Sequence, residues 1–243
     1  MTRKWETPPA TSSAKPLLGR ILEARGLNDH ESLRAFLDPK LSTLEDPSEL
    51  PGATEAGEIL CKAIRAGQKV LIYGDYDADG ITASAVLYHI IAAATGKEGP
   101  AVYIPNRIEE GYGINVGAIE KFAQEGVDVV VSVDCGVTAV EAAKKAKQLG
   151  ITLIVTDHHK PREDGELPDC AAIVHPGLEG EPETFFAGVG VAYQLGWAFA
   201  RAWSGAQHVT DTLSKCLLEM LPFVAIGTIA DMVPLQNGNR ILS

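Results

Sequence analysis

The sequence has few cysteines and no long uninterrupted apolar run. Its four cysteines are widely spaced, with no Cys-x-x-Cys pair, so we expect reduced, mostly buried thiols and neither a zinc ribbon nor a disulfide framework. The longest apolar-rich stretch, 85–94, is interrupted by His89 and is far shorter than the ~20 residues of a membrane span. Residues 1–16 lack the apolar segment of a secretory signal. We therefore expect a cytoplasmic protein with no membrane partner.

Basic residues are also scarce relative to acidic ones. Lys and Arg number 21 against 32 Asp and Glu, which gives a net charge of -11, whereas general nucleic-acid binding usually uses a basic surface. An excess of carboxylates is, however, also what a site for two divalent cations requires. Charge alone therefore leaves the function open, and the motifs must decide it.

The distribution of prolines and apolar residues divides the chain near residue 50. Residues 1–50 are expected to form a disordered start and a short helical extension. Residues 51–243 are expected to form one domain, with a sheet part at about 67–176 and a helical part at about 186–243, broken at Gly205 and Pro222. Strand-like apolar runs occur at 69–73, 101–104, 127–133, 151–155 and 171–174, separated by helical patterns at 81–94, 116–124 and 139–149. Such runs, apolar on both faces, predict an α/β fold with a mainly parallel sheet and helices on both faces.

Acidic and imidazole side chains follow three of these strands. The first strand runs into Asp75, Asp77 and Asp79, the strand from 127 into Asp134, and the strand from 151 into Asp157-His158-His159. In an open parallel sheet, ligands bind at the carboxyl ends of the strands, so these groups are expected to converge there. So many carboxylates repel one another unless bound cations compensate them. Oxygen ligands with one or two imidazoles suit Mn²⁺ or Mg²⁺ better than zinc.

Each cluster also has an ordinary explanation. Residues 75–80 match the D-x-D-x-D-G opening of a calcium loop, but loop position twelve is Val86, not Glu, and a strand precedes the loop. Asp134 taken alone is better explained as a helix N-cap. A lone His is explained as a loop residue, whereas the adjacent pair His158-His159 after Asp157 is much less ordinary. Gly188-Val-Gly190 matches half of a dinucleotide fingerprint and is interpreted as close helix packing. The three clusters together favour a shared metal site.

Four separated motifs resemble those of the DHH phosphoesterases. They are YGDYDADGITAS at 73–84, VDCG at 133–136, TDHH at 156–159 and GTIADMVPL at 227–235. The DYDADG form, PNRIEEGYG at 105–113 and RGLNDHESLRAFLDP at 25–39 resemble the RecJ-like single-strand DNA nucleases within that family. The similarity covers about 17–243. Two departures are His175-Pro176 in place of an expected Asn-Pro pair, and the absence of the DHHA1 domain and OB-fold with which such nucleases continue.

The resemblance implies a site with two divalent cations, Mn²⁺ or Mg²⁺. By this resemblance, the metal ligands are expected to be Asp77, Asp79, Asp134, His158 and Asp231, with Asp134 bridging the ions. The resemblance also implies catalytic roles for Asp75, Asp157 and His159. Asp75 is an additional ligand or a neighbour of the ligands, Asp157 orients an imidazole or a metal-bound water, and His159 contacts the scissile phosphate.

Substrate contacts are expected outside the metal cluster. Arg107 either holds a substrate phosphate or pairs with Glu109 or Glu110 at the surface. Tyr76 and Tyr112 are candidates for stacking on bases, but a structural role is favoured for Tyr76 because it lies inside the metal loop. The implied activity is 5′-to-3′ hydrolysis of single-stranded DNA in repair or recombination, with replication and repair proteins as further partners. The alternatives are a phosphoesterase for short oligonucleotides or other small phosphodiesters, and an inactive DHH scaffold or binding protein.

Overall fold

A computed structural model describes residues 16–178, 180, 182, 184–206 and 208–243. The predicted disorder of the start of the chain concerns residues that lie almost wholly outside this range. The chain forms two compact units, Met1–Leu44 and Glu45–Ser243. In the first, the predicted helical segment forms α1 (Leu17–Ala24) and α2 (His30–Leu37). The Asp29 carboxylate caps α2 by accepting the main-chain N–H groups of Glu31 and Ser32.

The second unit is built on a parallel five-stranded sheet, as the sequence predicted. The strands are β1 (Val70–Gly74), β2 (Ala101–Tyr103), β3 (Val129–Val133), β4 (Thr152–Thr156) and β5 (Ala172–Val174), in the order β2-β1-β3-β4-β5. Every described neighbouring pair is parallel. β1 and β3 are buried at all five positions, because helices cover both faces of a central parallel strand. This explains their continuous apolar sequence.

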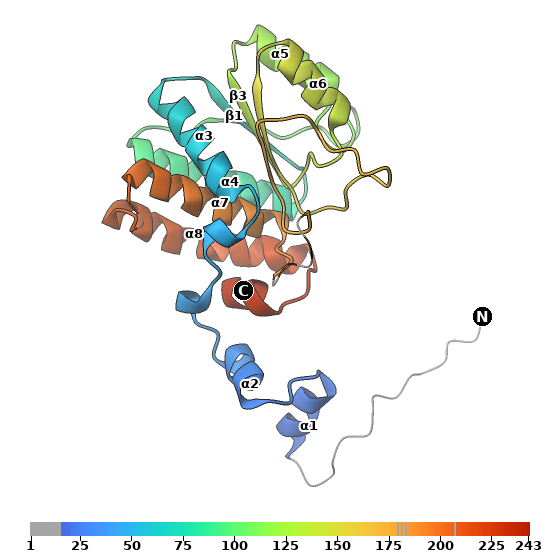
Figure 1. Cartoon of the computed structure of the whole chain (residues 1–243), viewed down its shortest axis with the longest axis vertical. Helices are drawn as coiled ribbons and strands as arrows, with labels where there is room; N and C mark the ends of the chain where they lie inside the picture. Colours follow the sequence, from blue (N-terminus) through green and yellow to red (C-terminus); the bar gives the residue numbers. More distant parts are fainter. Residues whose placement is uncertain (1–15, 179, 181, 183, 207) are drawn as a thin grey trace, which may run out of the picture. The chain divides into compact units, whose positions relative to one another are not determined.

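Helices lie on both faces of this sheet (Figure 1). On one face, α5 (Val116–Gln124) and α6 (Val140–Gln148) pack over a buried cluster that includes Phe122 and Tyr73. The other face carries α3 (Ala53–Arg65), α4 (Ala78–Thr95) and α7 (Gly188–Ser204), and α8 (Asp211–Ala230) packs against α4 and α7. The short α9 (Asn237–Leu242) follows. The predicted helices on both faces are confirmed.

Gly205 ends α7 as predicted, but the predicted break at Pro222 is wrong. Gly205 adopts a left-handed conformation with φ 65° and serves as the C-cap. Pro222, in contrast, lies inside the continuous helix α8. A proline costs a helix one hydrogen bond and some steric strain. The packing of α8 against α4 and α7 compensates for that loss.

Two of the helices, α4 and α8, are long and apolar enough to cross a membrane by length and composition alone. Core helices of folded domains pass the same test. Half of α4 is buried inside the domain, and the first turn of α4 carries the buried carboxylate of Asp79. The apolar composition of α4 is therefore explained by its central position between the sheet and the outer helices.

Candidate metal centre

The predicted acidic and imidazole groups lie at the ends of three strands and at the end of one helix. β1 leads directly into α4, whose N-cap is Asp77; its carboxylate accepts the N–H groups of Asp79 and Gly80 at 2.9 and 3.0 Å. β3 ends before Asp134 and β4 ends before the Asp157–His159 turn. Asp231 is the C-cap of α8. All of these residues lie in the second unit.

The structure brings the predicted ligands into three overlapping groups. Within each group, one potential ligand atom per residue lies within 4.8 Å of the others. The groups are Asp75, Asp77, Asp134; Asp79, His158, Asp231; and Asp134, His158, His159. The first two share no residue, and the third joins them through Asp134 and His158. Two adjacent clusters joined by a bridging carboxylate form an arrangement that suits a pair of divalent ions.

His158 lies at the centre of this arrangement. Its Nε2 is 3.2 Å from Asp134 Oδ1 and 3.8 Å from an oxygen of both Asp79 and Asp231. Among the described residues, His158 Nε2, Asp134 Oδ1 and Asp75 Oδ1 are buried and lack a hydrogen-bond partner. Buried polar atoms without a partner are costly and uncommon. Their grouping at one point fits a site built to coordinate cations.

The backbone geometry of Asp134 differs from what a helix cap would show. The N-cap of α6 is Ala139, with no side-chain capping bond, so Asp134 does not cap that helix. Its own φ is 62°, in the left-handed region that Asp adopts more readily than most residues. The side chain is 1% exposed. The turn after β3 therefore points this carboxylate into the centre of the site at a cost in backbone energy.

The amino terminus of α7 holds Asp79, a contact that sequence reasoning missed. Gly188 N donates to Asp79 Oδ2 at 2.7 Å and Val189 N to Oδ1 at 2.8 Å. A Cβ on Gly188 would lie 2.4 Å from Asp134 Oδ1, so only glycine fits there. The two glycines of Gly188-Val-Gly190 indicated close packing, as interpreted from the sequence. The sequence did not indicate that the packing partners are the metal-site carboxylates.

Burial and mutual repulsion disfavour the charged forms of the central carboxyls. Burial, followed by repulsion from Asp79 and Asp77, raises the pKa of Asp134 to about 10. Burial likewise raises the pKa of Asp79 to about 6, and it raises that of Asp75. Asp134 would therefore hold a proton near neutral pH unless a cation replaced it, and burial makes ionisation of Asp79 and Asp75 less favourable. A divalent ion stabilises the ionised forms directly.

The two adjacent histidines differ in charge because their partners differ. Burial, followed by the nearby His159, lowers the pKa of His158, which keeps it neutral, as a metal ligand must be. The hydrogen bond to Asp157 raises the pKa of His159 to about 9; Asp157 Oδ1 lies 2.8 Å from its Nδ1. Burial opposes ionisation of Asp157, but hydrogen bonds from His159 and from Val137 N outweigh it and lower its pKa. His159 is thus a cation next to the cluster.

Aromatic rings flank the histidine pair. The Tyr112 hydroxyl lies 2.9 Å from His159 Nδ1, and the two rings are 5.5 Å apart. Phe185, which sequence reasoning also missed, has its ring centre 6.3 Å from that of His158. Tyr112 and Phe185 are 49% and 40% exposed, so both offer apolar surface to a substrate at the site. No spacing in the sequence links Phe185 to the DHH turn.

Arg107 lies outside the three ligand groups. Its guanidinium stacks over the Tyr76 ring at 5.0 Å. The described residues show no ion pair between Arg107 and either Glu109 or Glu110. Glu110 instead accepts the Tyr103 hydroxyl at 2.6 Å. The surface ion pair is therefore not formed among the described residues, and the substrate contact of Arg107 stays a prediction.

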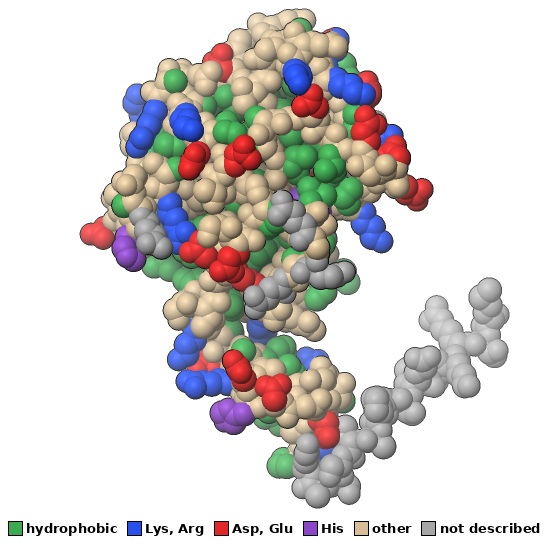
Figure 2. Space-filling view, in the orientation of Figure 1, with side chains coloured by type: hydrophobic (Ala, Val, Ile, Leu, Met, Phe, Trp, Pro, Cys, Tyr) green, Lys and Arg blue, Asp and Glu red, His purple; other side chains and the backbone are tan. Residues whose placement is uncertain are grey.

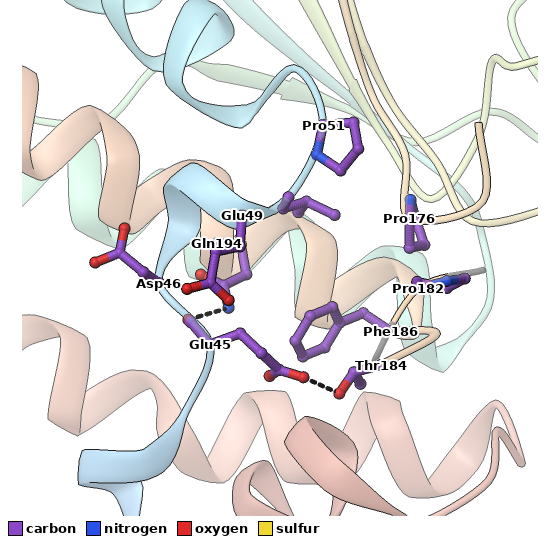
Figure 3. A pocket seen from close by; sticks show the side chains of 10 residues that line it. Glu45, Asp46, Glu49, Pro51, Pro176, Pro182, Thr184, Phe186 and Gln194 are labelled. Carbon is purple, nitrogen blue, oxygen red and sulfur yellow. Dashed lines mark hydrogen bonds between the residues drawn. The ribbon is translucent and has the colours of Figure 1, made fainter. Parts of the chain in front are cut away.

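A separate pocket of about 260 Å³ is lined by none of the residues of the three ligand groups. Figure 3 shows it between the Glu45–Pro51 side and the segment that carries Pro176 and Phe186. Thr184 donates to the Glu45 carboxylate, and Gln194 Nε2 donates to the Glu45 carbonyl at 3.1 Å. These bonds fix the segment that leads into α7, and thereby support the position of the α7 amino terminus.

Comparisons with known proteins agree with this geometry. The profile of the DHH family, N-terminal domain, matches residues 69–228. The chain therefore belongs to the DHH family of proteins.

Within that family, it resembles the single-stranded-DNA-specific exonuclease RecJ. It is 41% identical to RecJ of Bacillus subtilis (strain 168), over 94% of this chain and 27% of that protein. It is 34% identical to RecJ of Escherichia coli (strain K12), over 98% of this chain and 41% of that protein. The chain thus spans well under half of the length of these relatives.

Solved RecJ structures have the same fold. RecJ bound to manganese matches with a TM-score of 0.69 and 36% identity, over 79% of this chain and 46% of the other. RecJ from Thermus thermophilus in complex with Mn²⁺ matches with a TM-score of 0.71 and 32% identity, over 91% and 29%. These matches confirm the predicted α/β fold and its resemblance to RecJ.

Proposed function

We propose that this chain hydrolyses phosphodiester bonds with two divalent cations, Mn²⁺ or Mg²⁺. The proposed ligands are Asp77, Asp79, Asp134, His158 and Asp231, with Asp75 as an additional ligand or neighbour. One observation carries the proposal: two ligand clusters meet at Asp134 and His158, where buried ligand atoms lack partners among the described residues. The two RecJ structures that contain manganese support the choice of metal.

Such ions supply an activated water at neutral pH and stabilise charge on both the attacking and leaving oxygens. The chain's own residues would then place the substrate. The His159 imidazolium, 43% exposed, would donate to a phosphate oxygen, which gains charge during hydrolysis. Asp157 would hold that ring in place and keep it protonated. His158 would remain neutral and coordinate through Nε2.

For the substrate, we propose single-stranded DNA digested as an exonuclease, in the 5′-to-3′ direction that the family resemblance implies. The names of the relatives support the strand type. The exposed rings of Tyr112 and Phe185 beside the histidines could stack on bases without regard to sequence. Arg107, stacked on Tyr76, could contact a phosphate. Roles in repair and recombination, and contacts with replication or repair proteins, follow as proposals from the same resemblance.

A second candidate is hydrolysis of short oligonucleotides or other small phosphodiesters. The net charge of -11 favours it, because long strands bind best to continuous positive surface. On the face shown in Figure 2, Lys and Arg side chains lie scattered among Asp and Glu. An inactive scaffold is the less favoured alternative, because the structure brings together every proposed ligand.

A direct test compares Mn²⁺-dependent nucleotide release from a long single strand, labelled at either end, with release from a dinucleotide. The exonuclease proposal expects rapid release from the 5′-labelled strand. Preference for the dinucleotide would support the second candidate. Titration calorimetry with Mn²⁺ alone, on the wild type and the Asp134→Asn variant, tests the metal centre. If the wild type does not bind Mn²⁺ at millimolar concentration, the proposed enzymatic function is rejected and the inactive scaffold remains as the alternative.

A further inference from the structure

His175, which lies outside the three ligand groups, is placed where it can act on the DHH turn. It is the first residue after β5, and Val174 at the end of β5 pairs in register with Thr156 at the end of β4. Asp157 N also donates to the Val174 carbonyl at 3.1 Å. The segment that follows β5 therefore runs beside Asp157–His159. The side chain of His175 is only 1% exposed.

Both ring nitrogens of His175 are used, and their partners define the tautomer. Gly177 N donates to Nδ1 at 2.9 Å, and a nitrogen that accepts an N–H bond carries no proton itself. The ring proton of neutral His175 therefore lies on Nε2. This nitrogen is 2.8 Å from the His159 carbonyl oxygen, so it donates to that oxygen. Burial lowers the pKa of His175, in agreement with a neutral ring.

The bond from His175 completes the restraint of the His159 backbone. His159 N donates to Asp157 Oδ1 at 3.1 Å, and its carbonyl accepts from His175. The peptide group on each side of His159 is therefore fixed by a different buried side chain. The adjoining His158 ring has its Nε2 3.2–3.8 Å from three carboxylates, distances that a small rotation of the turn would change.

We propose that His175 is a positioning residue, which orients the His158 and His159 imidazoles through its hydrogen bond to the His159 carbonyl. This inference rests on the proposed metal-dependent function. A purely space-filling role does not explain the bond, because an apolar side chain would fill this buried position without the cost of desolvating an imidazole. The His175 ring lies beside that of Phe185, with the two ring centres 6.3 Å apart, and its backbone neighbour Gly177 would place an added Cβ 3.4 Å from His175 Cε1.

The test compares His175→Gln with His175→Leu. Glutamine can place an N–H near the position of Nε2, whereas leucine fills part of the volume and donates nothing. We expect His175→Leu to lower kcat by roughly ten- to a hundredfold, since small misplacements of reacting groups have effects of that size. Its Mn²⁺ affinity should fall about tenfold, as for other partners that orient ligands. Glutamine should restore most of both values, because it keeps a donor for the His159 carbonyl.

Three measurements separate the possible outcomes. Equal kcat and equal Mn²⁺ affinity for the two variants would overturn the positioning role, even if both melt at lower temperature. Nitrogen-15 spectra of the wild-type imidazoles should show His175 protonated at Nε2 only; protonation at Nδ1 would also overturn it. If the wild type binds Mn²⁺ but hydrolyses neither substrate, the proposed activity fails, and the Mn²⁺ affinities of the two variants still decide the role of His175.

Discussion

Replacing Asp134 with asparagine should make the metal-free protein more stable at pH 8 and remove its response to Mn²⁺. Asparagine has nearly the same shape as aspartate and tolerates the left-handed backbone, here with φ 62°. The substitution therefore removes an ionisable group whose charged form is disfavoured by burial, without adding strain. It also removes the carboxylate shared by two ligand groups, so the two effects have one structural cause.

The size of the effect follows from the pKa of Asp134, which rises from 3.8 to about 10 on folding. At pH 8 the unfolded chain has this group ionised, while the folded chain must bind a proton. The ~4 pH units between 3.8 and 8 correspond to about 1.36 kcal/mol each. They set an upper limit of about 6 kcal/mol on the free energy of unfolding that Asp134→Asn can add at pH 8. Neighbouring carboxyls such as Asp79 share the repulsion, so we expect about half of this limit, which corresponds to a melting temperature about 6–12 °C higher. At pH 4 the difference should vanish.

The assay is thermal unfolding at pH 4 and pH 8, with and without Mn²⁺. For the wild type, Mn²⁺ at a hundred times its dissociation constant should add about 2.7 kcal/mol, and Asp134→Asn should add nothing. Asp164→Asn is a matched control, because that exposed carboxylate pairs with Arg162 at the surface. The reasoning is refuted if Asp134→Asn melts below the wild type at pH 8, or if it keeps the full Mn²⁺ response.

Three further predictions concern the same site. Without metal, stability should fall as pH rises from 6.5 to about 9, because in this window folded Asp134 and folded His159 each retain a proton that the unfolded chain has lost. Urea unfolding at several pH values in this window tests the prediction, and a rise in stability would contradict it. Gly188→Ala should abolish Mn²⁺ binding in calorimetry and lower the stability of the fold by about 1–3 kcal/mol, because its Cβ would meet Asp134. The control Gly117→Ala, where the nearest atom is 3.4 Å away, should bind Mn²⁺ normally. Arg107→Ala should raise KM for single-stranded DNA and leave Mn²⁺ affinity unchanged; an unchanged KM would exclude the phosphate contact.

The strands were predictable to within about two residues because their burial on both faces gives a continuous apolar signal. The predicted run 127–133 became β3 at Val129–Val133, and the run 151–155 became β4 at Thr152–Thr156. The start of α4 was predicted three residues late, at 81 in place of Ala78. The start was missed because the acidic motif overlaps the beginning of the helix. Asp77 is both the N-cap of α4 and a proposed ligand, and the first helical turn contains Asp79 in place of apolar residues.

The ligand cluster was predictable from strand ends, whereas the contacts that support it were not. Parallel strands carry their carboxyl ends to one edge, so Asp134 and His158 had to approach each other. Asp231 follows a helix, and only the family resemblance indicated its place. The bonds from Gly188 to Asp79 and from His175 to His159 join distant segments through main-chain atoms. Such atoms carry no residue-specific signal, so these bonds could not be read from the sequence.

The same contacts explain how the fold tolerates so unfavourable a cluster. Asp79 accepts two N–H groups at the amino terminus of α7, where the helix dipole favours negative charge. Asp157 accepts N–H groups from the turn it belongs to and from Val137. Asp134, in contrast, has a buried oxygen with no donor among the described residues, and its pKa of about 10 lies well above that of Asp79. Because the fold supplies donors to these neighbours and leaves Asp134 unsatisfied, the strongest drive for cation binding is concentrated on the carboxylate that links the ligand clusters.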